Sequence, residues 1–139
     1  PKGKIKLNPE ESLSFTGDTV AYCLYAYVTS QSLLKRATSS DFQFCDSFSK
    51  LGTLEERALA LNIVQLPEVI KMSAAKYDPS LLAEHILKLA HSFHNYYGKE
   101  KIICEDSEIS KERLALVSTF AESMKWALSL LGIDVLDEM

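Results

Sequence analysis

The sequence predicts an all-α domain, a bundle of about five helices, and three observations support that prediction. Apolar residues recur every three or four positions in several long stretches, which is the repeat of one face of an α-helix. Those stretches are bounded by residues that start and stop helices. Finally, 139 residues, of which 47% are hydrophobic and 24% charged, have the composition of one ordinary globular domain.

The first long helix is expected to start at Asp18 or Thr19 and to run to about Ala37. Its apolar residues recur at helical spacing, and the basic residues Lys35 and Arg36 suit the negative end of the helix dipole in the last turn. Periodicity then disappears between residues 38 and 52. That stretch is predicted to be a loop with three apolar anchors, at least two of which are expected to fold back on the helices: Phe42, Phe44 and Phe48.

Two helices are predicted in the next part of the chain. Thr53 and Glu56 have the spacing of a capping box, which indicates the start of a short helix. Pro67 is placed as the first residue of a second helix, because proline is favoured there and disfavoured inside helices. This second helix is expected to direct four apolar residues inward before it breaks near residue 77, namely Val69, Ile70, Ala74 and Ala75.

The next helix has the strongest start signal, because Asp78 can accept from free N–H groups and Pro79 needs no N–H donor there. Gly98 is expected to end it near Tyr97, and it should pair with the preceding helix as an αα-hairpin. Its apolar stripe is Leu82, Ile86, Leu89 and Phe93. A final helix of about 22 residues is expected from 107–110 to a C-cap at Gly132, followed by a tail over 133–139.

One side of the 79–97 helix is the best candidate surface for RNA. Lys88, His91 and Asn95 share a polar face, and the helix ends on Tyr96 and Tyr97. Two lysines that can attract phosphates follow at once, Lys99 and Lys101. Aromatic rings are platforms for unstacked bases, and an asparagine can pair with a base edge. Adjacent helical residues point about 100° apart, so we expect one tyrosine to complete the core stripe and the other to remain available to a ligand.

Several other kinds of site are disfavoured. His91 and His94 could share a metal with His85 or Glu84, but zinc needs three or four convergent ligands, so no metal is expected. The run 71–74, Lys-Met-Ser-Ala, begins like the ATP loop of class I synthetases, but it lacks the terminal lysine and lies in a helical pattern.

Charge and cysteine content narrow the class of protein further. A net charge of −4 argues against a long basic surface for polyanions, yet it leaves room for recognition of an unstacked RNA loop. Three widely spaced cysteines without a CxxC pair disfavour disulfides, and no apolar run is long enough to span a bilayer. We therefore expect a cytoplasmic protein with no membrane partner.

The order and spacing of several short runs resemble the C-terminal anticodon-binding (DALR-type) domain of arginyl-tRNA synthetases. The ending is similar too, with a glycine-terminated helix followed within a few residues by Met139. The runs that carry the resemblance are Leu66-Pro67-Glu68-Val69-Ile70, Ala74-Ala75, Pro79, Leu82-Ala83, Leu89-Ala90, Phe93-His94, Tyr96-Tyr97, Arg113-Leu114-Ala115-Leu116-Val117 and Leu130-Leu131-Gly132-Ile133.

The resemblance implies a function. Residues 1–15 would be a junction from a preceding catalytic domain, and residues 16–139 the helical domain that positions arginine tRNA for ATP-dependent aminoacylation. This chain itself would hold no catalytic residue, cofactor or metal; ATP with Mg would bind the parent enzyme. One loop phenylalanine could stack on a base. The expected tRNA-binding residues are Tyr22, Tyr25, Lys88, His91, Asn95, Tyr96, Tyr97 and Met139.

Two alternatives stay open, and the match has departures. The chain could be a structural helical domain that docks on another domain or protein, or the anticodon domain of a cysteinyl-tRNA synthetase. For Tyr22 and Tyr25, core packing and RNA contact are equally compatible with the sequence. The family pattern is not kept at Val20, Ala21, Leu24, Tyr27, Thr29 and Glu100, so contacts that the family makes there are not implied here.

Overall fold

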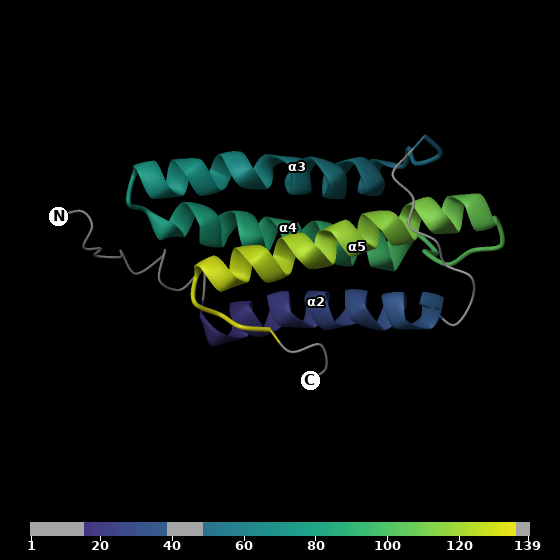
Figure 1. Cartoon of the computed structure of the whole chain (residues 1–139), viewed down its shortest axis with the longest axis horizontal. Coiled ribbons are helices and arrows are strands. Elements are labelled where there is room, and N and C mark those ends of the chain that lie inside the picture. The colour runs from purple at the N-terminus through teal and green to yellow at the C-terminus, as the bar shows by residue number, and fades with distance from the viewer. Residues whose placement is uncertain (1–15, 39–48, 136–139) are drawn as a thin grey trace.

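A computed structural model describes residues 16–38 and 49–135, and these residues form a helical bundle without strands. Its helices are α2 (Gly17–Thr38), α3 (Leu54–Ala75), α4 (Pro79–Lys99) and α5 (Ser107–Leu130). The expectations for residues 1–15, for Phe42, Phe44 and Phe48, and for Met139 lie outside the described residues. Figure 1 shows the long axes of all four helices running nearly side by side, with α4 and α5 between α3 and α2.

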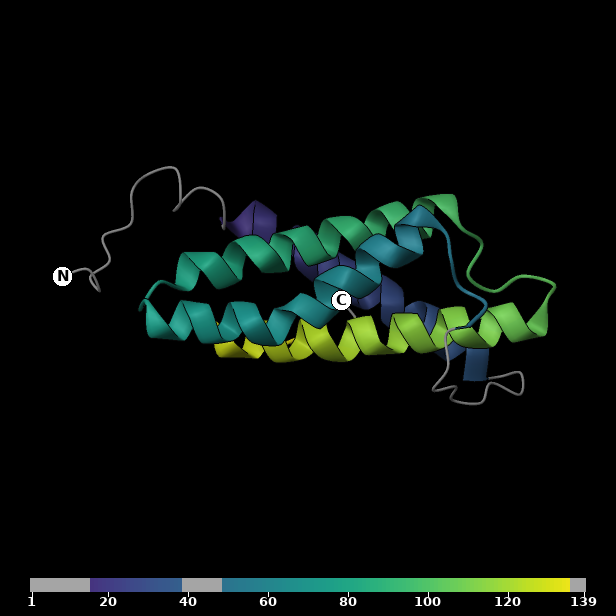
Figure 2. The same ribbon diagram turned by 90° about the horizontal axis from the view of Figure 1, so that it is seen from above.

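The prediction of about five helices is wrong for the described residues, which form four, because α3 is one helix with Pro67 inside it. Proline removes one backbone hydrogen bond, but the buried residues before and after it lie on one continuous face, at Leu59, Asn62, Leu66 and Ser73. Packing of that face on α4 therefore outweighs the local cost. Figure 2 shows α3 bending about half way along its length, which we attribute to Pro67.

The turn between α3 and α4 has the predicted αα-hairpin form. The N–H groups of Tyr77 and Asp78 donate to the carbonyls of Ala74 and Ser73, at 3.2 and 2.9 Å, which is a Schellman ending. Tyr77 has a φ of 52°, a left-handed conformation that usually belongs to glycine. Asp78 then caps α4 by accepting from Ser80 N–H, as predicted.

The core is built on the α4 stripe. Its predicted residues Leu82, Ile86, Leu89 and Phe93 are all buried, and the Phe93 ring stacks on that of Phe120 of α5 with centroids 4.4 Å apart. By contrast, the expectation that Ala74 and Ala75 face inward is wrong, since both are exposed near the end of α3. Ser73 is the buried residue of this last turn, so Ala74 and Ala75 lie on the outer side of the helix.

α5 ends as predicted, with Gly132 at a φ of 82° and Ile133 N–H donating to the Leu128 carbonyl at 2.9 Å. Ile133 and Val135 then pack, partly buried, against the core. Figure 1 shows this segment turning back along the bundle toward α2. Among the described residues, no helix combines the length and the apolar character that crossing a bilayer requires.

Candidate nucleic-acid interface

The last turn of α4 separates the two adjacent tyrosines. Tyr96 is fully buried, whereas Tyr97 is 43% exposed and its ring stacks on that of Phe93 with centroids 6.0 Å apart. One tyrosine therefore completes the core stripe and the other faces outward, as expected. Tyr96 has no ring face to offer a base, so it does not belong among the candidate RNA contacts.

Tyr96 instead joins a buried polar network around Glu56. The Tyr96 hydroxyl donates to the Glu56 carboxylate at 3.1 Å, and the N–H groups of Gly52 and Thr53 donate to the other carboxylate oxygen. Burial alone raises the pKa of Glu56. These hydrogen bonds and the nearby Arg113 outweigh burial, so the pKa lies below its ordinary value.

Arg113 links this network to the end of α4. Its Nε donates to Glu56 at 2.8 Å, and its two other nitrogens donate to the Lys101 carbonyl at 2.9 Å and to Glu100 at 3.2 Å. Three segments distant in the sequence are thus joined through one guanidinium. The segment that follows Tyr97 is held in place by these contacts, which fixes the surroundings of the exposed ring.

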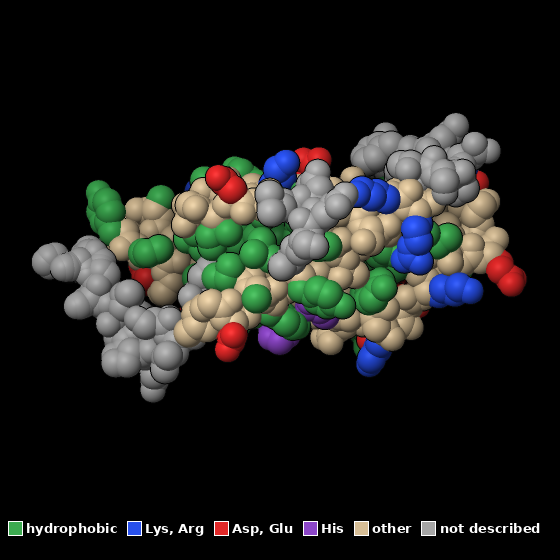
Figure 3. All heavy atoms as spheres, turned by 90° about the horizontal axis from the view of Figure 1, so that it is seen from below, with side chains coloured by type: hydrophobic (Ala, Val, Ile, Leu, Met, Phe, Trp, Pro, Cys, Tyr) green, Lys and Arg blue, Asp and Glu red, His purple; other side chains and the backbone are tan. Residues whose placement is uncertain are grey.

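A second group of rings lies where α2 meets α4. This aromatic cluster consists of Tyr22, Tyr25, His91 and His94. The Tyr22 hydroxyl lies 2.8 Å from His91 Nδ1, and the His94 ring lies 4.5 Å from the Tyr22 ring and stacks at 5.5 Å on the Tyr25 ring. Tyr25 is 60% exposed. The cluster therefore presents ring surface to solvent, and Figure 3 shows histidine side chains near the middle of this face.

His94 contacts the rings of both tyrosines in the cluster. Its Nε2 is buried and has no hydrogen-bond partner. Burial, followed by the proximity of His91, lowers the pKa of His94, and a hydrogen bond involving Tyr22 only partly opposes this shift. The His94 ring, packed against both tyrosines, serves as a flat support. In the described part of the chain, no three His, Cys, Asp or Glu side chains converge as metal ligands.

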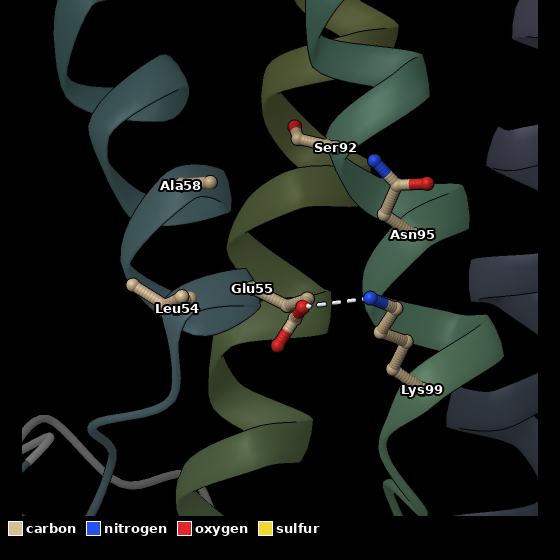
Figure 4. A pocket seen from close by; sticks show the side chains of 6 residues that line it. All are labelled: Leu54, Glu55, Ala58, Ser92, Asn95 and Lys99. Atoms are coloured by element: carbon tan, nitrogen blue, oxygen red, sulfur yellow. Dashed lines mark ion pairs between the residues drawn. The ribbon is translucent and has the colours of Figure 1, made fainter.

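Lys88 and Asn95 lie on a different side of α4. Both are exposed, but Asn95 lines a shallow hollow between α4 and the start of α3, where Lys99 pairs with Glu55 at 3.5 Å. Figure 4 shows Lys99 of α4 reaching toward Glu55 of α3, with Asn95 one turn earlier on α4. The predicted single surface therefore divides. Lys88 and Asn95 lie toward α3, whereas Tyr97 and the aromatic cluster, which includes His91, lie toward α2.

Tyr97 borders a hollow of its own. This Tyr97 hollow is lined by Leu33 and Arg36 of α2, by Tyr97, and by residues 100–103 of the connection to α5. Figure 3 shows that lysine and arginine side chains gather toward the end of this face at which α2 finishes. An exposed aromatic ring beside basic side chains can take both the base and the phosphate of a nucleotide.

The structure describes the surroundings of the positions that depart from the family pattern. Tyr27 is buried in the core, and Glu100 is engaged by Arg113. Thr29 is half-buried on α2, whereas Ala21 is exposed.

Sequence reasoning missed several participants. His94 was considered only as a metal ligand and as part of a family pattern. The i, i+3 spacing of Tyr22 and Tyr25 matches that of His91 and His94 and could have paired them. Arg113 was noted only as part of a pattern. No local signal identifies its partners, because they lie 12 or more residues away.

Comparison with known proteins agrees with this geometry. Residues 23–139 match the family model of the DALR anticodon binding domain. The chain is 37% identical over 130 residues to an arginine–tRNA ligase of Limosilactobacillus fermentum, and 34% identical over 140 residues to that of Flavobacterium psychrophilum. These matches cover 94% and 100% of this chain, and 23% of each relative.

A solved structure shows the same arrangement of helices. The arginyl-tRNA synthetase of Thermus thermophilus superposes with a TM-score of 0.78 at 30% identity, over 97% of this chain and 24% of that one. The chain spans about a quarter of the length of these relatives. Since the family model matches most of its length, the chain belongs to the DALR anticodon-binding domain family.

Proposed function

We propose that this domain binds the anticodon loop of arginine tRNA for a parent arginine–tRNA ligase. A catalytic domain elsewhere in that parent would join arginine to the tRNA with ATP and Mg²⁺, in the cytoplasm. The free thiols of Cys23 and Cys104 fit a reducing compartment. Residues 1–15 would connect the two domains, and residues 16–139 would form the RNA-binding unit.

The observation that carries the proposal is a pair of exposed tyrosine rings, each supported by another ring. Tyr25 is 60% and Tyr97 43% exposed, and they stack on His94 and Phe93 respectively. Sequence-specific RNA recognition targets unstacked loop bases, which stack on such rings. Rings that are already held in place lose little conformational entropy on binding. This favours a preorganised binding site over two tyrosines that are exposed by chance.

We assign contacts with the loop to the face shared by α2 and α4. Tyr25 and Tyr97 would stack on bases, while Tyr22 and His91 would offer polar atoms to base edges or to the RNA backbone. Lys88 and Asn95 would reach RNA only where the stem or loop passes around the outer edge of α4. We also propose Met139 as a contact, because the family resemblance implies one there.

The test is binding of anticodon stem-loops, measured by fluorescence anisotropy. Stem-loops of arginine tRNA with the native anticodon should bind more tightly than those with substituted anticodon bases. Replacing Tyr97 by alanine should weaken binding by roughly 1 to 3 kcal/mol, the usual loss for one stacking platform. Equal affinity for native and substituted anticodons would refute anticodon recognition.

The isolated chain should have no ligase chemistry of its own. Residues 71–74 lie inside α3, so the run that begins like an ATP loop is regular helix. We therefore expect no arginine-dependent pyrophosphate exchange by the 139-residue chain. Detectable exchange by the pure chain would require active-site residues that we have not assigned.

A further inference from the structure

The Tyr97 hollow has the size and the walls of a site for one nucleotide. Its volume is about 340 Å³, near the lower end of the roughly 300 to 1,000 Å³ typical of small-molecule sites. Leu33 of α2 and Ile102 of the connection are both buried at its margin. A planar group lying on the Tyr97 ring would therefore meet apolar side chains from two different segments.

The ring of Tyr97 is fixed before any ligand arrives. It stacks on Phe93 with an interplanar angle of 20°, and Phe93 stacks on Phe120 with an angle of 8°, so three rings extend from the core to the surface. The connection beyond Tyr97 is held by the bond from Arg113 to the Lys101 carbonyl. Both the platform and the wall beside it are thus in place in the unbound domain.

Two cations border the hollow, Arg36 in the last turn of α2 and Lys101 in the connection. The acidic residue that also lines it, Glu100, is neutralised by Arg113 at 3.2 Å. A guanidinium carries five N–H donors, so Arg36 can bind an anionic oxygen beside its other contacts. The hollow therefore combines an aromatic platform with positive charge from two sides.

We propose that the Tyr97 hollow holds one unstacked nucleotide of the anticodon loop, with its base on Tyr97 and an adjoining phosphate bound by Arg36 and Lys101. This inference rests on the proposed function and adds to it the two residues that neutralise the phosphate. Arg36 lies outside the surface predicted for RNA, whereas Lys101 was predicted there only as one of two lysines that attract phosphates. They come together only because α2 ends where the connection after α4 begins.

The experiment measures stem-loop affinity as a function of salt for the Arg36→Gln and Lys101→Gln variants. Each phosphate contact in a single strand contributes about 0.7 to the slope of log affinity against log salt. Each substitution should therefore reduce the slope by about 0.7. The ratio of the affinity at 0.1 M salt to the affinity at 1 M salt should then be about fivefold smaller than in the wild type. Lys101→Arg should restore both.

The matched controls are Lys71→Gln and Lys125→Gln, which remove the same charge from exposed positions on α3 and α5. They should leave the slope unchanged. Stacking is tested separately with 2-aminopurine placed at each loop position in turn. One position should show quenching on binding that Tyr97→Leu abolishes, because leucine keeps apolar packing on Phe93 without a ring face.

The outcomes separate the inference from the function on which it rests. If the wild-type chain binds the stem-loop but the Arg36 and Lys101 variants keep the slope of the controls, the phosphate site is overturned and anticodon binding stands. The base assignment is overturned if no loop position loses quenching in Tyr97→Leu. If the wild-type chain does not bind the stem-loop at all, both proposals are overturned together.

Discussion

Replacing Arg113 by methionine should destabilise the domain strongly, because it leaves a buried carboxylate without its cation. Methionine keeps most of the apolar stem of arginine, so the change removes charge and donors more than volume. The side chains of Arg113 and Glu56 are only 13% and 3% exposed, so water cannot replace the lost partner at Glu56. The variant therefore isolates the electrostatic role of the guanidinium.

The expected loss follows from the contacts that remain. Removing one partner of a buried ion pair costs about 3 to 5 kcal/mol. Glu56 would still accept from Gly52 N–H, Thr53 N–H and the Tyr96 hydroxyl, so we expect the lower end, about 3 kcal/mol. For a domain of this length that corresponds to a fall of roughly 10 °C in Tm.

Urea unfolding followed by circular dichroism measures this loss, with Lys111→Met as the matched control on the same helix. Lys111 pairs with Glu108 at 3.8 Å, and the two side chains are 34% and 62% exposed. Such an exposed pair is worth about 0 to 1 kcal/mol. If the two variants lose equal stability, the Glu56–Arg113 pair does not have the role assigned to it.

Three further results are expected. The pKa of Glu56 in the folded domain is lowered below 4.5, so its carboxylate stabilises the fold fully above that pH and loses this contribution as the pH falls further. In Glu56→Gln, the free energy of unfolding in urea should therefore decrease less at acid pH than in the wild type. Tyr77→Gly should raise stability by about 1 kcal/mol by relieving a left-handed φ, and unchanged stability would argue against strain. Deleting residues 137–139 should leave Tm unchanged but lower stem-loop affinity; unaltered affinity would remove Met139 from the site.

Features set by local chemistry could be predicted from the sequence. The Thr53–Glu56 capping box and the Asp78–Pro79 start depend on residues within one helical turn, and both are confirmed. The number of helices could not be obtained in this way. Whether Pro67 begins a helix or bends one depends on the face packed against α4, which is a long-range property.

The candidate site was predictable along one helix but not between helices. Helical geometry alone implied that Tyr96 and Tyr97 would differ in exposure, and their burial agrees. Which way Asn95 would face depended on the position of α3, and the stacking of Tyr25 on His94 depended on α2 packing beside α4. Periodicity places residues on a face but does not say which helix covers it.

The most direct test of the account is an NMR titration of the isotopically labelled domain with the anticodon stem-loop of arginine tRNA. We predict chemical-shift changes concentrated at Tyr22, Tyr25, His91 and Tyr97, with Leu61 and the rest of the outer face of α3 unaffected. Changes confined to α3, or an absence of changes along the face shared by α2 and α4, would contradict the claim that this face binds the anticodon loop.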